Sequence, residues 1–159
     1  MQTTIVYIHE MLYWRRYVML RINKRRSPCH CINLRRAAGM VSELYDAYLE
    51  PAGISVNQLS LLVNLRHLGT ASVSDLASYV GLERTTVVRT VKPLLERGLV
   101  EDASAIGQRN RALQLTALGK QTLKQALPLW DEAQGEMERR LGKEKVAELY
   151  EILAMLEES

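Results

Sequence analysis

The spacing of apolar residues predicts helices over most of the chain beyond residue 31. A first apolar stripe at helical spacing runs from Ile32 to Leu49 and stops at Pro51. A second helix is predicted after Ser55, because Gln58 follows three residues later in a capping-box pattern. The regular part of the chain therefore begins with two helices.

After the second helix, the pattern predicts two more helices and then two strands. Ser72, with Asp75 three residues later, predicts a short helix, and residues 82–97 predict another. Two segments of alternating apolar residues, 99–104 and 111–116, predict strands around a polar loop. A pair of helices followed by a hairpin is the layout of a winged helix-turn-helix.

Two more helices are predicted after the hairpin. Thr116 precedes a long helical segment with an expected bend at Pro128, and residues 143–158 carry the last apolar stripe. The expected fold class is mainly α with a small β-hairpin. The winged helix-turn-helix core is expected at about 54–116, and the flanking helices at about 32–50 and 117–157.

Residues 1–28 differ in composition from the rest of the chain. They are aromatic and basic, and Pro28 separates them from the expected domain at 29–159. The segment is interpreted as an N-terminal extension. A helix at the spacing of Tyr7, Met11 and Trp14, a disordered basic arm, and a stretch upstream of the native start are the alternatives.

The charge of the chain is unevenly distributed. The net charge is only +3, but residues 1–36 hold eight Lys or Arg and one acid, while residues 131–159 hold nine acids and four bases. Any contact with a polyanion is therefore expected away from the C-terminus. The two cysteines form no disulfide framework and no apolar run is long enough to span a bilayer, which indicates a cytoplasmic protein with no membrane contact.

The helix at 82–97 has two contrasting faces on a helical wheel. The apolar arc is predicted to pack on the core and holds Val87, Val88, Val91, Leu94 and Leu95. The polar arc is predicted to face outward and holds Thr85, Thr86, Arg89, Lys92, Pro93 and Glu96.

The polar arc has the chemistry of a surface that reads the major groove of DNA. Threonine hydroxyls bond to base edges, threonine methyls contact the thymine methyl, and an arginine binds guanine through two hydrogen bonds. Lys92 is better placed for a phosphate. A merely solvated helix face is the alternative, and the neighbouring short helix and hairpin favour the DNA interpretation.

The loop of the predicted hairpin adds positive charge, because Arg109 and Arg111 lie there without a neighbouring acid. An arginine on a narrow hairpin can enter the minor groove, where negative potential is concentrated. A solvated loop is the alternative for Arg109, and packing against the helix is the alternative for Arg111. The candidate DNA-binding residues are Arg84, Thr85, Thr86, Arg89, Lys92, Arg109 and Arg111.

The run SVSDLASYVGLERTTVVRTVKPLLERGLVE, followed by RALQLTALG, resembles the MarR family of bacterial winged helix-turn-helix transcription regulators. The likeness covers about residues 29–157. It implies a homodimer with interlocking flanking helices that binds a palindromic operator in double-stranded DNA as a repressor. It also matches Arg111 to the arginine of the family's Asp-x-Arg wing motif, but Arg109 stands at the Asp position, so the ion pair that orients the wing is not expected here.

The stretch Cys29-His30-Cys31 raises the question of metal or redox chemistry. The three side chains are too close in sequence to complete a tetrahedral site, so neither a metal nor a cofactor is predicted. Some regulators of the family sense oxidants through a cysteine near the start of the first dimerisation helix, and Arg35 would supply a positive setting. Two small buried side chains without reactivity are the alternative.

The resemblance also implies an effector. Small phenolic compounds or aromatic acids bind such regulators between the dimerisation helices and the winged lobe. The candidate lining residues are Tyr45, Tyr48, Arg66 and His67, and ordinary packing or surface exposure is the alternative for each of them.

Two other classes of function fit the sequence less well. A winged-helix module for protein–protein interaction should expose apolar or aromatic anchors on its recognition face, where this sequence has Thr, Arg and Lys. An enzyme is not expected, because the sequence has no Ser, His and Asp order, no paired-carboxylate motif and no glycine-rich phosphate loop.

Overall fold

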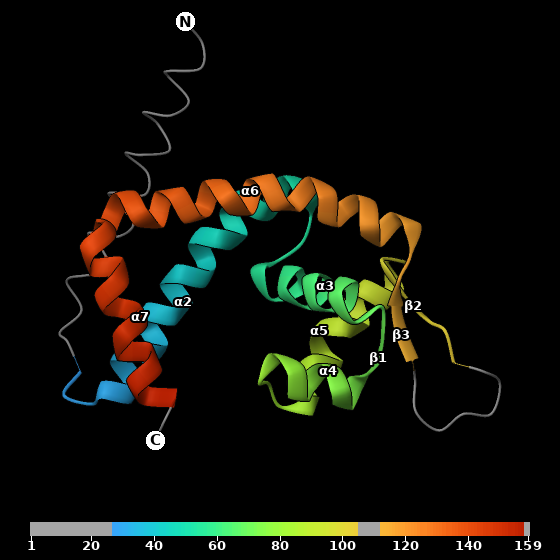
Figure 1. Cartoon of the computed structure of the whole chain (residues 1–159), viewed down its shortest axis with the longest axis horizontal. Helices are drawn as coiled ribbons and strands as arrows, with labels where there is room; N and C mark the ends of the chain where they lie inside the picture. The colour runs from blue at the N-terminus through green and yellow to red at the C-terminus, as the bar shows by residue number, and fades with distance from the viewer. Residues whose placement is uncertain (1–26, 105–111, 158–159) are drawn as a thin grey trace, which may run out of the picture. The chain divides into compact units, whose positions relative to one another are not determined.

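A computed structural model describes residues 27–104 and 112–157, which are mostly helical with one small sheet (Figure 1). The chain divides into two compact units, residues 1–40 and 41–159. The predicted N-terminal extension lies outside the described residues as far as residue 26. The elements are α2 (His30–Leu49), the 3₁₀ helix η1 (Glu50–Ala52), α3 (Val56–Leu68), β1 (Thr70–Ser72), α4 (Val73–Val80), α5 (Arg84–Glu96), β2 (Val100–Asp102), β3 (Ala112–Leu115), α6 (Ala117–Leu141) and α7 (Lys143–Glu157).

Side-chain caps fix where three of the helices begin. The Gln58 and Asp75 N–H groups donate to Ser55 Oγ and Ser72 Oγ at 3.3 and 3.1 Å, and both side chains return a bond to the cap N–H. Thr116 Oγ1 accepts from the Gly119 N–H at 3.0 Å at the start of α6. Each cap satisfies a backbone donor that has no partner inside its own helix. The predicted capping boxes are thus confirmed.

The sheet has three antiparallel strands in the order β1-β3-β2, rather than the two-stranded hairpin expected from the sequence. The additional strand β1 pairs Thr70 with Gln114 and Ser72 with Ala112. It is three residues long, too short to show a strand period, and its partner β3 lies about 40 residues further along the chain. The sequence pattern therefore missed it for a physical reason: the pairing is not local.

The hydrophobic core of the second unit forms where α3, α4, α5, the sheet and the first half of α6 meet (Figure 1). Its largest fully buried side chains in α3 to α6 are Leu61, Leu62, Leu65, Leu76, Val87, Leu94, Val100, Leu113 and Leu123. All nine are leucine or valine, and the remaining buried core residues are alanines, further leucines and valines, and Ile54. One side of α5 packs against this core, so the opposite side of α5 faces solvent.

Two prolines lie inside helices. α6 is assigned as one helix through Pro128, and α5 continues through Pro93. Each proline removes one N–H from the helical ladder, and at Pro93 the group left without that donor is the Arg89 carbonyl. No helix among residues 27–104 and 112–157 combines the length and the apolar character needed to cross a membrane.

Candidate nucleic-acid interface

The turn between α4 and α5 is set by Gly81, which adopts a left-handed conformation at φ 67°. The Leu82 N–H donates to the Ala77 carbonyl at 3.0 Å and closes the end of α4. A residue with a Cβ is strained in this conformation, so a glycine gives the tightest reversal into the next helix. The α4–turn–α5 pair is the helix-turn-helix predicted from the sequence.

α5 is seated by three residues on one side. The side chains of Val87, Val91 and Leu94, all in α5, are buried in the core. At the other end, Arg97 Nη1 donates to the Gly53 carbonyl at 2.6 Å and ties the end of α5 to the loop before α3. Arg97 is a positioning residue that the sequence did not reveal, because its partner lies 44 residues away.

The opposite side of α5 presents polar and basic side chains to solvent. Arg84, Thr85, Arg89 and Lys92 are all exposed, as predicted for a surface that contacts a partner. Thr86 is half-buried, and its carbonyl accepts the Thr90 hydroxyl at 2.9 Å. The predicted DNA-contacting residues of α5 therefore share one face, with Thr86 at its edge.

Val88 was predicted to lie in the core, and this prediction is wrong: its side chain is 48% exposed. The apolar arc read from the sequence is wider than the strip of α5 that its neighbours cover. That strip is centred on Val87, Val91 and Leu94. Val88 lies beside the strip on the helix surface, toward the outward side.

The charges on the outward face are concentrated in the first three turns of α5. Arg84, Arg89 and Lys92 are basic, and Glu96 follows one turn after Lys92. Lys92 Nζ lies 3.8 Å from a carboxylate oxygen of Glu96, with both side chains largely exposed. Such a surface ion pair contributes little stability, so it leaves Lys92 able to turn toward a phosphate. Because Glu96 is negatively charged, the end of this face is unfavourable for a polyanion.

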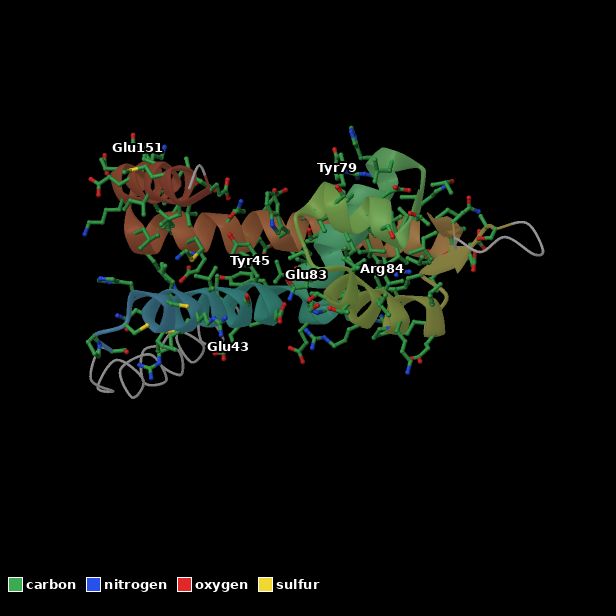
Figure 2. All side chains as sticks on the ribbon, turned by 90° about the horizontal axis from the view of Figure 1, so that it is seen from below. Glu43, Tyr45, Tyr79, Glu83, Arg84 and Glu151 are labelled. Atoms are coloured by element: carbon green, nitrogen blue, oxygen red, sulfur yellow. The ribbon has the colours of Figure 1, made fainter. Side chains whose placement is uncertain are left out.

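The start of α5 also offers backbone donors. Glu83 precedes the helix, and its side chain makes no capping hydrogen bond. Figure 2 shows Glu83 and Arg84 together at this end of α5. The first N–H groups of a helix point out of its end and favour an anion, but at α5 the Glu83 carboxylate adds a negative charge beside them.

The wing is described only at its base. The Ala112 N–H donates to Ser104 Oγ at 2.7 Å, and the Ser104 N–H donates to Asp102 Oδ1 at 3.0 Å, which closes the two strands below the loop. The two arginines expected at the minor groove, Arg109 and Arg111, lie outside the described residues.

The two cysteines lie where α2 begins, and both are exposed rather than buried. The Cys29 carbonyl accepts the Asn33 N–H at 3.2 Å, and the Cys29 N–H donates to Ser27 Oγ at 3.1 Å. Among the described residues, no group of three or more His, Cys, Asp or Glu side chains is arranged to hold a metal ion.

The four residues proposed to line an effector pocket make different contacts. Tyr45 donates its hydroxyl to Gln134 of α6 (Figure 2), whereas the His67 ring packs on Tyr79 of α4 with the ring centroids 6.0 Å apart. Tyr48 is half-buried on α2 and Arg66 is exposed on α3. A separate open hollow of about 330 Å³ lies between α6 and α7, lined by Glu138, Lys143, Val146, Ala147 and Tyr150.

The environment of Tyr45 changes its acidity. Burial raises the pKa of Tyr45 above its ordinary value of 10.0, and the nearby Tyr150 and Glu138 raise it further. The phenol therefore stays protonated and remains a hydrogen-bond donor across the neutral range.

Known proteins resemble the chain in sequence and in fold. The model of the MarR family matches residues 54–102. The Bacillus subtilis (strain 168) protein YwoH, an uncharacterised HTH-type transcriptional regulator, is 33% identical over 91 residues, which are 57% of this chain. The chain spans 65% of that relative's length.

Solved structures extend the likeness beyond the matched core. The M. tuberculosis transcriptional regulator MosR, in a crystal structure in complex with DNA, is 32% identical with a TM-score of 0.69, covering 82% of this chain and 96% of that chain. A mutant E. coli MarR complexed with operator DNA shares the fold at 23% identity and a TM-score of 0.67, covering 79% of this chain and 94% of that chain. Because the sequence likeness to MosR covers almost all of that protein, and because α4, α5 and the sheet form the winged helix-turn-helix, the chain belongs to the MarR family.

Proposed function

We propose that this protein is a transcriptional regulator that binds a palindromic operator in double-stranded DNA as a homodimer, most simply as a repressor. The observation that carries the proposal is the outward face of α5. Arg84, Thr85, Arg89 and Lys92 are exposed on it, directly above the buried Val87 strip that holds the helix in place. A rigidly seated helix with basic and hydroxyl side chains fits the width and donor–acceptor pattern of the major groove.

A homodimer is proposed because α7 leaves an apolar face uncovered within one chain. Leu149, Ile152, Leu153 and Leu156 recur at helical spacing, and each is between 38% and 54% exposed. A second copy related by two-fold symmetry would cover this face. Two α5 helices would then meet half-sites about one helical turn, or roughly 34–36 Å, apart on one side of the duplex.

The DNA proposal is tested by selecting bound sequences from a random pool of double-stranded DNA with the full-length protein. An enriched inverted repeat is expected, and Arg89→Ala should weaken binding to it by about 1–3 kcal/mol for each half-site and relax the preferred base there. Arg139→Ala is the matched control, because it removes the same charge from an exposed site at the end of α6. Affinity should fall steeply with salt for the wild type.

Two outcomes would contradict the proposal that α5 contacts bases in the major groove. If no sequence is enriched, or if Arg89→Ala and Arg139→Ala bind the selected DNA equally well, α5 does not read bases. The alternative, a module for protein–protein interaction, would then be favoured by the exposed Tyr79 and Leu82 beside α5.

Oxidation is a second proposal, for how DNA is released. Both Cys29 and Cys31 are exposed, so an oxidant reaches them without unfolding of α2. Peroxide is expected to lower operator affinity of the wild type, while a Cys29→Ser, Cys31→Ser double variant should keep its affinity. Equal loss in both proteins would exclude the thiols as the sensor.

A small phenolic or aromatic-acid effector is the remaining proposal for release. The half-buried Tyr45 and Tyr48 on α2 support it, because aromatic side chains stack on such ligands. The test is a titration of salicylate against the protein–operator complex. Dissociation in the wild type but not in Tyr48→Ala is expected, and no dissociation in either would remove this class of effector.

A further inference from the structure

We propose that Val88 reads a thymine C5-methyl group in each half-site of the operator. The proposal rests on the proposed function and adds to it a residue that determines which base is preferred. Val88 is 48% exposed on the outward side of α5, although its apolar side chain gains nothing from contact with water.

The surroundings of Val88 favour a nucleic acid as the group that covers it. Arg84 lies four residues before it, Thr85 three residues before it, and Lys92 four residues after it, so all three are its neighbours on the helix surface. All three are exposed. A single apolar side chain surrounded by two cations and a hydroxyl is poorly suited to an apolar protein partner, but a groove between two phosphate backbones matches this charge.

The chemistry of the groove then identifies the contact. Among the groups that base pairs present in the major groove, the thymine methyl is the apolar one. Val88 is the fifth residue of α5, in the half of the helix where base edges are reached. A valine in a helix has one strongly preferred rotamer, so its two methyls are held in position and little entropy is lost on contact.

The experiment uses the full-length protein and the operator recovered by selection. Each thymine in turn is replaced by deoxyuridine, which removes only the methyl group. At one thymine in each half-site, the wild type should lose about three- to fivefold in affinity for a single replacement. Val88→Ala should bind the original operator more weakly by a similar factor and should show no further loss at that position.

Thr85→Ser is the matched control, because it removes the neighbouring exposed methyl and keeps the hydroxyl. It should retain the full response to deoxyuridine at the thymine assigned to Val88. The inference is overturned if wild type and Val88→Ala lose the same factor at every thymine, or if the response disappears in Thr85→Ser instead. These outcomes differ from a failure of the proposed function, in which no operator is enriched or Arg89→Ala binds normally.

Discussion

Gly119 shows how a single residue sets the approach of α6 to the winged core. A Cβ at this position would collide with the Leu99 carbonyl oxygen. Thr116 stabilises this close approach of α6. Its N–H donates to the Leu99 carbonyl at 3.2 Å, and its hydroxyl donates to the Gly98 carbonyl at 2.7 Å. The start of α6 is thus fastened to the segment that leads from α5 into β2.

Replacement of Gly119 by alanine is expected to destabilise the protein strongly. The methyl group collides with backbone that cannot move without disturbing β2, so Gly119→Ala should lower the free energy of unfolding by about 2–3 kcal/mol. Gly135→Ala is the control in the same helix, where an added Cβ meets nothing within 4 Å. It should raise the free energy of unfolding by about 0.5–1 kcal/mol.

The measurement is urea denaturation followed by circular dichroism at one fixed protein concentration, since stability of a dimer depends on concentration. A Gly119→Ala protein as stable as Gly135→Ala would show that α6 does not approach Leu99 so closely.

At the scale of elements, the second half of α2 is joined to α6 by the hydrogen bond between Tyr45 and Gln134. The two residues are 89 positions apart in the chain. The contact therefore links the segment before the winged core to the helix that follows it. Partial burial of the phenol also makes the link sensitive to alkaline pH, because the charged form is poorly solvated there.

The pH dependence of this link has a defined sign. The folded state holds the Tyr45 proton more tightly than the unfolded state, whose pKa is 10.0, so the stabilisation is complete below pH 10.0 and is lost as pH rises above it. Tyr45→Phe should cost about 1 kcal/mol of unfolding free energy near pH 8, because Gln134 loses its donor. The difference from wild type should shrink above about pH 10.

Urea unfolding at several pH values measures this difference. Tyr79→Phe is the control, since it removes the hydroxyl from a ring that is 52% exposed. If the wild-type and Tyr45→Phe curves stay parallel up to the alkaline limit, Tyr45 does not couple pH to folding.

For the molecule as a whole, the apolar face of α7 matters most, since each of its four leucine and isoleucine side chains is still 38–54% exposed in one chain. The four side chains that form it, Leu149, Ile152, Leu153 and Leu156, lie at i, i+3, i+4 and i+7. Figure 1 shows α7 at the end of α6 away from the sheet, so an interface here would join two copies without covering α5. Dimerisation and DNA contact would then use separate surfaces.

Placing a charge in this face should separate the two copies. Leu153→Glu is expected to give a monomer by light scattering and to lower operator affinity by roughly 10²-fold or more, because binding of the second half-site is no longer intramolecular. Ala154→Glu is the matched control, since it adds the same carboxylate on the far side of α7. A Leu153→Glu protein that remains a dimer with unchanged affinity would place the interface elsewhere.

The sequence by itself determined the features that depend on near neighbours in the chain. The capping boxes at Ser55 and Ser72 span three residues, and the helical stripes span one or two turns, so local patterns predicted them correctly. The order of the predicted elements indicated the motif of two helices and a hairpin. The same order identified α5 as the candidate DNA-recognition helix.

Only the tertiary structure decided the features that depend on distant partners. β1 exists because β3 pairs with it, and Val88 is exposed because α3, α4 and the sheet cover a narrower strip of α5 than its apolar arc. The contacts of Arg97 with Gly53 and of Tyr45 with Gln134 likewise cross 44 and 89 residues. Periodicity shows which side of a helix is apolar, but the surrounding elements determine how much of that side is buried.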